Sequence, residues 1–347
     1  MGMRERQPSP SPGSAQRVMD PVGHVNLAYV EPAHLPRWLA GSRTYPLAVV
    51  SFGSPLSLPV RCPVVHLDLP QLDGPRHCEV WSTVQSVRSY QTGNFSAAVS
   101  GDVLFGSISM PEVPAALLDH TTEMAYRDIF RQIGPLGFTH LWRIWNYFPR
   151  INEEEHGLER YRRFCVGRHQ ALAETLPDFP SSLPAGTAVG TRSGPLQIYF
   201  LAGAHPVTHI GNPRQVDAYN YPSSYGPRSP SFARATLCRS EAAMQLFIAG
   251  TASVVGHESR HQGQPDRQAR ETITNLQVLI DRAECFEDVP QTQSLFKIYL
   301  RNPEHIDLVR RTLQETPLMR SSRLLFLQGD LCRKELLVEI EGLVTRD

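Results

Sequence analysis

Residues 336–342 read Leu336-Leu337-Val338-Glu339-Ile340-Glu341-Gly342, an apolar stretch near the C-terminus that carries two carboxylates. Side chains alternate between the two faces of a β-strand, so Glu339 and Glu341 should share one face with Leu337 and Leu343. A carboxylate among leucines is costly to bury unless it is paired, protonated or used. The stretch therefore predicts a strand whose Glu339 is either a general acid or a structural, hydrogen-bonded carboxylate, and residue types alone weigh the two equally.

The residues before this strand alternate between strand-like and helix-like patterns. Strands are expected at 244–255 and 294–300, and helices at 266–283 and 303–313, where apolar residues recur at helical spacing. The strand at 323–327 is expected to pair with 336–343 as a hairpin around Gly329-Asp330.

A similar strand–helix–strand order occurs roughly 145 residues earlier, at 101–108, 121–133 and 137–147, which indicates an internal repeat. We therefore expect an α+β fold with two repeated strand–helix units. The expected division is a disordered tail at 1–20, an N-terminal unit at 21–150, a connecting helix and loop at 151–240, and a C-terminal unit at 241–347.

Composition excludes several classes of protein. The formal net charge is zero, so the chain lacks the basic excess of a nucleic-acid or anionic-membrane binder. No apolar run approaches the ~18 residues of a membrane-spanning helix, and the N-terminus lacks the apolar core of a signal peptide. The six cysteines are scattered without a CxxC pair, as in reduced cytosolic proteins. We expect a cytoplasmic protein with a small-molecule partner.

The segment His257-Glu258-Ser259-Arg260-His261 matches the HExxH pattern of zinc proteases. That chemistry needs a helix, but glycine precedes the segment, and Gly263 and Pro265 follow it within a few residues. We interpret it as a structural or substrate-facing loop and expect no metal site.

Residues 216–234 form a loop rich in tyrosine, proline and serine, which carries Tyr221, Tyr225, Arg228 and Arg234. Guanidinium groups and tyrosine hydroxyls suit the recognition of carboxylates, although a solvated surface loop explains the composition equally well. Arg320 alone suggests a surface charge. Cys332, a lone cysteine seven residues before Glu339, is by type more often inert than reactive.

The chain resembles two known protein families, and each resemblance implies roles for the candidate site residues. Residues 246–342 resemble the RidA/YjgF family of small trimeric proteins, through the blocks 268–276, 297–302, Arg320-Ser321 and 338–341. In that family, the first Glu of the final strand and the Arg of the Arg-Ser step line a cleft between subunits. The resemblance implies chorismate-mutase-like units that form a pseudo-oligomeric core within one chain, a site containing Glu339 and Arg320, and either a monomer or a small homo-oligomer.

Over about residues 90–343, the chain resembles the chorismatases, which are built from such units. The matching blocks are 95–102, 140–147, 161–168, 225–234, 250–257 and the final strand. Chorismatases split chorismate into pyruvate and a ring product without metal or organic cofactor. Those that form hydroxybenzoates carry a Cys seven residues before the catalytic Glu, the position of Cys332. The resemblance thus implies 3-hydroxybenzoate as the product, with or without 4-hydroxybenzoate beside it.

In this interpretation Glu339 protonates the enolpyruvyl methylene, and Cys332 contacts the ring. Arg228, Arg234, Arg320, Tyr221 and Tyr225 bind the substrate, and Gly250 lets the ring approach the backbone. Three alternatives remain at this point: hydrolysis of chorismate to a dihydroxycyclohexadiene carboxylate, a RidA-type enamine or imine deaminase, and a non-catalytic protein that senses a small carboxylate.

Overall fold

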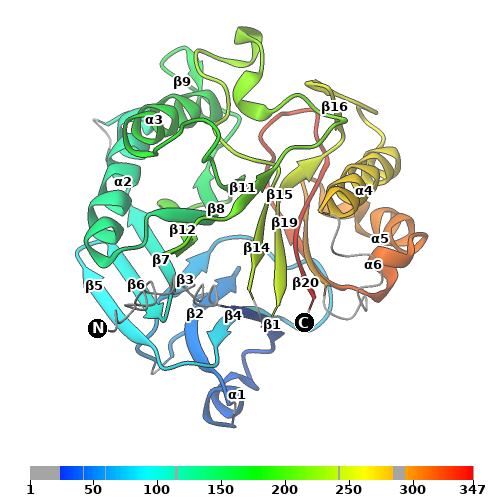
Figure 1. Ribbon diagram of the computed structural model, residues 1–347. Coiled ribbons are helices and arrows are strands. Elements are labelled where there is room, and N and C mark those ends of the chain that lie inside the picture. Colours follow the sequence, from blue (N-terminus) through cyan, green and yellow to red (C-terminus); the bar gives the residue numbers. More distant parts are fainter. Residues whose placement is uncertain are drawn as a thin grey trace, which may run out of the picture.

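The computed structural model describes residues 24–41, 43–58, 60–113, 116–240, 243–283 and 294–346. The expected tail at 1–20 and Cys285 lie outside these ranges. The three larger β-sheets of the described residues, of four, six and six strands, surround one shared core, and helices cover the outer faces of these sheets (Figure 1). The expected α+β class is confirmed. No helix in the described ranges is long and apolar enough to cross a membrane.

The second sheet has the strand order β11-β8-β12-β7-β6-β5. Helices α2 and α3 pack on its outer face, and the short hairpin β9–β10 precedes α3. We call residues 88–203 the second unit. Its elements are β5 (Arg88–Thr92), β6 (Phe95–Ser100), β7 (Val103–Met110), α2 (Leu118–Ile133), β8 (His140–Pro149), β9 (Glu154–Glu155), β10 (Leu158–Glu159), α3 (Arg160–Thr175), β11 (Ala185–Thr191) and β12 (Leu196–Gly203).

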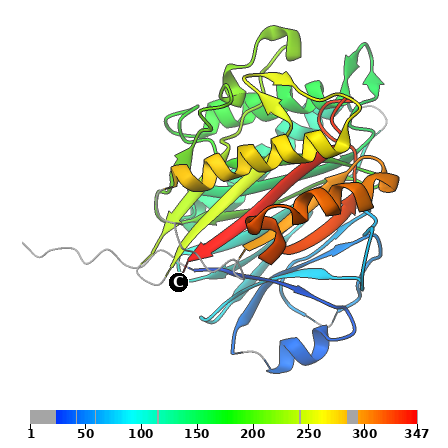
Figure 2. The same ribbon diagram turned by 90° about the vertical axis from the view of Figure 1, so that its right-hand side faces the viewer.

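The third sheet has the strand order β13-β14-β15-β20-β18-β19. Helices α4 and α5 lie across its outer face (Figure 2). We call residues 208–346 the third unit. Its elements are β13 (Thr208–Ile210), β14 (Ala235–Arg239), β15 (Met244–Ala252), β16 (Val254–Val255), β17 (Glu258–Ser259), α4 (Pro265–Arg282), β18 (Ser294–Leu300), α5 (Ile306–Gln314), α6 (Pro317–Ser321), β19 (Arg323–Gln328) and β20 (Val338–Arg346).

The second and third units have the same connectivity, which confirms the internal repeat. Apart from the two-stranded hairpins β9–β10 and β16–β17 and the short helix α6, three strands in each unit are followed by a helix, a strand, a helix and two strands. The last strand, β12 or β20, lies antiparallel between two neighbours, and the strand before it pairs in parallel with the strand between the helices. The segment 151–240, expected as a connection, supplies α3, β11 and β12 to the second unit and β13 and β14 to the third.

The first sheet is a shorter version of the same unit. Its strand order, β1-β4-β2-β3, reproduces the order and directions of the last four strands of the other units. We call residues 26–83 the first unit, with β1 (Asn26–Val30), α1 (Leu35–Gly41), β2 (Tyr45–Phe52), β3 (Val64–Leu67) and β4 (Cys78–Thr83). The sequence did not reveal a third repeat here.

The predicted hairpin between 323–327 and 336–343 is wrong. Strand β18 lies between β19 and β20, so the segment 329–337 crosses over β18 and places β20 in the middle of the sheet. A central strand is covered on both faces, and Val338 and Ile340 pack toward α4 and α5. Leu337 joins that same cluster because it precedes the strand, so it does not share a face with Glu339 as predicted.

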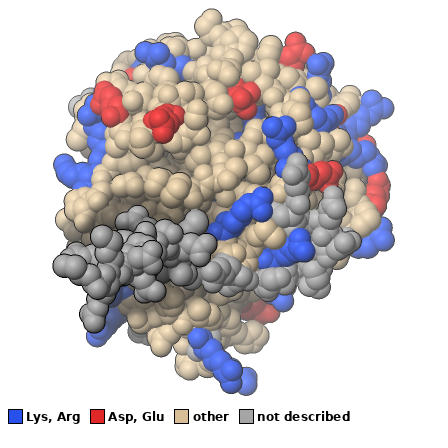
Figure 3. Space-filling model, in the orientation of Figure 1, with Lys and Arg blue, Asp and Glu red and all other residues tan. Residues whose placement is uncertain are grey.

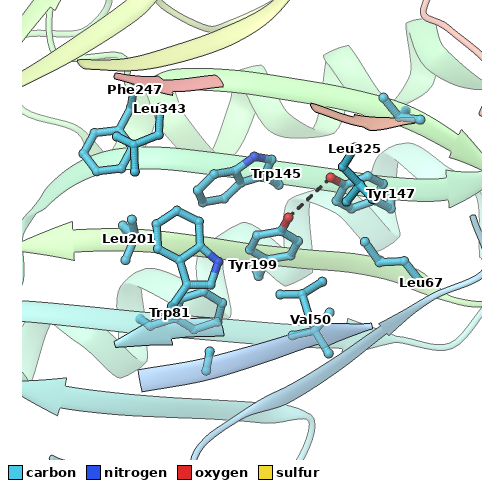
Figure 4. Close-up of a cluster of buried hydrophobic side chains, with 14 of the residues drawn as sticks. Val50, Leu67, Trp81, Trp145, Tyr147, Tyr199, Leu201, Phe247, Leu325 and Leu343 are labelled. Atoms are coloured by element: carbon cyan, nitrogen blue, oxygen red, sulfur yellow. Dashed lines mark hydrogen bonds between the residues drawn. The ribbon is translucent and has the colours of Figure 1, made fainter. Parts of the chain in front are cut away.

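The core between the three sheets is aromatic (Figure 4). Trp81 comes from β4, Trp145 and Tyr147 from β8, and Tyr199 from β12. The rings of Trp145 and Tyr199 stack with centroids 4.6 Å apart, and the hydroxyls of Tyr147 and Tyr199 are 3.4 Å apart. On the surface, charges of both signs are spread over the face seen in Figure 3, in keeping with the zero net charge.

Candidate active site

A pocket of about 390 Å³ opens between the second and third units. It is lined by parts of four segments: 154–162 around the β9–β10 hairpin, the 215–234 loop, 250–254 at the end of β15, and 332–339. The structure therefore brings together six of the predicted site residues: Glu339, Cys332, Arg234, Tyr221, Tyr225 and Gly250.

Glu339 is the buried acid of this pocket. It is the second residue of β20, pairs with Ala252 on one side and Tyr299 on the other, and is 4% exposed. Burial, and then the negative charge of Glu341, raise the pKa of Glu339 to about 8, against the opposing pull of Arg143, Arg301 and Arg234. At neutral pH, Glu339 is thus mostly protonated and able to donate a proton.

Gly250 makes room for the carboxyl group of Glu339. A Cβ at this position would lie 2.1 Å from Oε1 of Glu339 and 3.2 Å from Oγ1 of Thr187. The register between β15 and β20 shifts here, between Ile248 and Thr251, as is common beside active sites. We expected Gly250 to admit the substrate ring, but its closest neighbour in the structure is the acid itself.

Glu341 points toward the central core and remains ionised. It accepts hydrogen bonds from Trp145 Nε1 (3.0 Å), Tyr299 Oη (2.9 Å), Arg143 and Thr187, and Lys297 Nζ lies 2.6 Å from its Oε1. Although burial acts in the opposite direction, Lys297 and Arg143 hold the pKa of Glu341 below its ordinary value. The two carboxylates of β20 are therefore kept in different protonation states by their surroundings.

The wall opposite Glu339 is made of aromatic and arginine side chains. Arg234 Nη2 donates to Tyr221 Oη at 2.7 Å, and the guanidinium of Arg333 lies 4.2 Å from the ring centre of Tyr225. Tyr225 Oη and Arg333 Nη1 both donate to the carbonyl oxygen of His257, at 2.7 Å and 2.9 Å. The HExxH segment therefore supports the wall.

The HExxH segment is not helical, as expected. Glu258 and Ser259 form β17, and His261 has a positive φ of 55°. His261 Nε2 lies 3.3 Å from Glu271 of α4. Within the described ranges, no group of three or more His, Cys, Asp or Glu side chains is placed to hold a metal ion.

Two buried polar atoms of the pocket lining have no hydrogen-bond partner among the described residues. They are Nε of Arg234, which is 5% exposed, and Oε1 of Gln215, which is 8% exposed. Buried polar groups are rarely left unsatisfied, and each such exception requires an explanation. A ligand with a carboxylate and a hydroxyl group could satisfy both, since a guanidinium donates and an amide oxygen accepts.

Cys332 lies in the loop between β19 and β20 and lines the pocket. Burial, together with the nearby charge of Glu339, raises the pKa of this thiol to about 12, so Cys332 is a neutral thiol rather than a nucleophile. Arg301 fixes the loop, since it donates to the carbonyl oxygens of Leu331, Arg333 and Leu336 at 2.9–3.1 Å.

Two predicted substrate-binding residues do not line the pocket. Arg228 is exposed in the 215–234 loop. Arg320 is exposed on α6, where its Nε donates to the carbonyl oxygen of Gln314 at 3.1 Å. Helix α6 leads into the edge strand β19, whereas Glu339 lies beyond β18 on the inner face of the sheet. The structure therefore does not bring Arg320 to the acid.

Sequence reasoning missed several residues around the acid: Arg143, Thr187, Gln215, Lys297 and Arg333. Two of them carried the same signal as Glu339. Arg143 in Trp142-Arg143-Ile144 and Lys297 in Phe296-Lys297-Ile298 are single charges within apolar strands, and both are buried. A search for every isolated charge in an apolar strand would have found them.

Comparisons with known proteins identify the family of the chain. Residues 79–202 match the family described as "Chorismatase FkbO/Hyg5-like, N-terminal". The chain is 33% identical to a 3-hydroxybenzoate synthase of Streptomyces hygroscopicus, with 94% of each chain covered. It is 35% identical to a chorismatase of Streptomyces rapamycinicus, with 83% of this chain and 88% of the relative covered.

A solved chorismatase crystal structure superposes with a TM-score of 0.84 at 31% identity, covering 93% of this chain and 99% of the other. The chain belongs to the chorismatase family.

Proposed function

We propose that this protein cleaves chorismate to pyruvate and 3-hydroxybenzoate, with or without 4-hydroxybenzoate as a second product. The observation that carries the proposal is a carboxyl group protonated at neutral pH, Glu339, in a pocket where Nε of Arg234 has no hydrogen-bond partner among the described residues. Chorismate is a dicarboxylate with an enol ether, so it needs one proton donor and partners for its carboxylates. The full-length similarity to a relative named 3-hydroxybenzoate synthase supports the choice of product.

Glu339 starts the reaction by donating its proton to the methylene carbon of the enolpyruvyl group. The double bond supplies the electron pair for the new C–H bond, and an oxocarbenium ion forms next to the ether oxygen. The resulting carboxylate of Glu339 then stabilises this cation. The bond between the ring carbon and the ether oxygen then breaks, its electron pair stays with the oxygen, and pyruvate leaves, so that a cation remains on the ring. Migration of the neighbouring hydroxyl group to this carbon, followed by loss of the proton from that carbon to the carboxylate of Glu339, gives 3-hydroxybenzoate. Loss of the proton from the hydroxyl-bearing carbon without migration gives 4-hydroxybenzoate. The atoms of pyruvate and a hydroxybenzoate together equal those of chorismate, so the overall reaction needs no oxidant and no net water.

The substrate carboxylates are bound by the arginines of the pocket wall. Arg234 has a free Nε, and Arg333 and Arg162 also line the cavity. Tyr221 and Tyr225 orient these groups through the contacts described above. Cys332, as a neutral thiol near Glu339, lies against the ring and influences which hydroxybenzoate forms.

The test is to incubate the purified protein with chorismate, measure pyruvate, and separate the ring products by chromatography. We expect pyruvate and 3-hydroxybenzoate in equal amounts or, if some 4-hydroxybenzoate forms, pyruvate equal to their sum. A dihydroxycyclohexadiene carboxylate in place of the hydroxybenzoates would assign the protein to the hydrolytic branch. If the wild-type protein released no pyruvate, the proposal would be wrong, and ammonia release from an imine would indicate the deaminase alternative.

Three further expectations remain predictions. The domain boundaries expected at residues 20, 150 and 240 can be tested by limited proteolysis. The expected state is a monomer or a small homo-oligomer. Three sheets that already enclose one core within a single chain support the monomer, and light scattering would measure the mass. The cytoplasmic location, expected from the scattered cysteines, can be tested by cell fractionation.

A further inference from the structure

The pocket acid is connected to a cluster of buried charges at the centre of the molecule, to which all three sheets contribute. Glu79 comes from β4, Arg143 from β8, and Lys297 and Glu341 from β18 and β20. Each is at most 4% exposed. Lys297 Nζ lies 2.6 Å from Glu341 and 3.1 Å from Glu79, and Arg143 contacts Glu341. Removing these charges from water costs free energy of folding, so stability alone does not account for the cluster, and we looked for a catalytic role.

Geometry connects Glu341 to the proton donor. Glu339 and Glu341 are two residues apart on the same face of β20, so their side chains are roughly 7 Å apart along the strand. Thr187 bridges them: it donates to Glu341, and its Oγ1 accepts the N–H of Gly250, over which the carboxyl group of Glu339 lies. The five donors and cations around Glu341 fix both its position and its charge.

We propose that Glu341 is a positioning residue for catalysis, which holds the proton on Glu339 by presenting a fixed negative charge beside it. Lys297 and Arg143 secure that charge in turn. This inference rests on the proposed function, in which Glu339 must be protonated to act. It explains why a strand that needs one acid carries two carboxylates, and why the second one is so heavily paired.

Other charged and titratable groups also face these carboxylates. Arg143, Arg234 and Arg301 favour the ionised form of Glu339, and they come from β8, the 215–234 loop and the segment after β18. The remaining pocket-lining groups are Glu154, Glu159, Tyr161, Arg162, Tyr221, Tyr225, Cys332, Arg333, Lys334 and Glu335. Glu341 is further surrounded by Tyr29, Tyr147, Tyr199 and Tyr299. With three cations nearby, Glu339 depends on burial and on Glu341 to stay protonated.

The test is the pH dependence of kcat/KM for chorismate in the wild type and in Glu341→Gln. In the wild type, we expect kcat/KM to fall above about pH 8, as Glu339 ionises. In Glu341→Gln, this alkaline limb should move to lower pH by about one to two units, the size of a Coulomb interaction at roughly 7 Å with an effective dielectric constant of about 20. At pH 8, the loss in kcat/KM should therefore be about tenfold.

Two variants serve as controls. Glu341→Asp keeps the charge and should leave the limb within about half a unit of the wild type. Glu79→Gln removes a carboxylate that also contacts Lys297 but lies on another sheet, so it should move the limb far less than Glu341→Gln does. Equal shifts in Glu79→Gln and Glu341→Gln would overturn the proposal, as would an unmoved limb in folded Glu341→Gln protein.

A double variant covers the case in which Glu341→Gln alone does not fold. Lys297→Met with Glu341→Gln removes both charges of the pair and leaves no unpaired lysine. Glu79, which loses its cation, can take up a proton, because burial already raises its pKa. It should also move the limb to lower pH, and an unmoved limb would contradict the proposal. Infrared spectra give a readout besides activity: the C=O stretch of a protonated carboxyl group should be lost in Glu339→Gln and should disappear at lower pH in Glu341→Gln. Absence of wild-type turnover would refute the proposed function instead, and the spectra would still test the inference.

Discussion

Replacement of Glu339 by glutamine should abolish turnover and at the same time stabilise the protein. The carboxyl group is held neutral in the folded state, with a pKa of about 8 against an ordinary value of 4.5. An unfolded chain ionises the group above pH 4.5, whereas the folded chain does so only near pH 8. The wild type therefore loses stability as the pH rises between these two values. Glutamine has nearly the same shape but does not ionise, so the variant does not lose free energy of unfolding as the pH rises.

The size of the effect follows from the shift in pKa. Each unit corresponds to about 1.4 kcal/mol, so the penalty is about 1 kcal/mol at pH 5, about 3 kcal/mol at pH 7 and about 5 kcal/mol at pH 9. Glu339→Gln should exceed the wild type in free energy of unfolding by these amounts. The penalty is absent below pH 4.5 and complete above pH 8.

Urea denaturation of both proteins at pH 5, 7 and 9 measures these differences, and a chorismate assay on the same samples measures turnover. Glu335→Gln is a suitable control, because Glu335 lines the same pocket without full burial. Its unfolding free energy should differ little from the wild type across this range. A glutamine variant at 339 that is no more stable than the wild type at pH 9 would refute the claim that Glu339 is a buried, protonated acid.

Three further predictions concern the pocket. Cys332→Ala should change the ratio of 3- to 4-hydroxybenzoate while total chorismate consumption stays within a few-fold, and an unchanged ratio in chromatography would remove the steering role. Gly250→Ala should reduce kcat by at least about a hundredfold and cost about 1–3 kcal/mol in stability, because its methyl group overlaps Oε1 of Glu339; wild-type rates in a steady-state assay would contradict this. Arg234→Met should raise KM for chorismate by at least tenfold and lower kcat less, with Arg320→Met as the exposed control that leaves both unchanged; equal effects of the two would speak against a carboxylate contact.

The sequence predicted the repeated units and the acid because both depend on local patterns. The alternation around Glu339 and the helical stripe of α4 are visible in consecutive residues. The hairpin prediction failed because pairing between β19 and β18 depends on a crossover that local pattern does not encode. The first unit was missed because its strands are short and its one helix spans only Leu35–Gly41.

The prediction of the arginines in the site was likewise limited to what local sequence reveals. Arg234 was found because the loop around it is rich in aromatic and arginine residues, and Arg320 was misplaced because a motif match says nothing about which face of the sheet its helix reaches. Arg143 lies 196 residues before Glu339 in the chain, and the two meet only when the second and third sheets pack together. Contacts of this kind follow from tertiary packing, which residue types alone do not reveal.

The second and third units place different side chains at one shared structural position. Gln197 of β12 and Glu339 of β20 are each the second residue of the last strand, and each pairs with a tyrosine of the neighbouring strand, Tyr147 or Tyr299. Gln197 is an amide that donates to the carbonyl oxygen of Ile108, whereas Glu339 is the pocket acid. In an assembly of identical subunits, one substitution would alter every copy of this position at once. A single chain removes that constraint, so one position could become a proton donor while its counterpart became part of the scaffold.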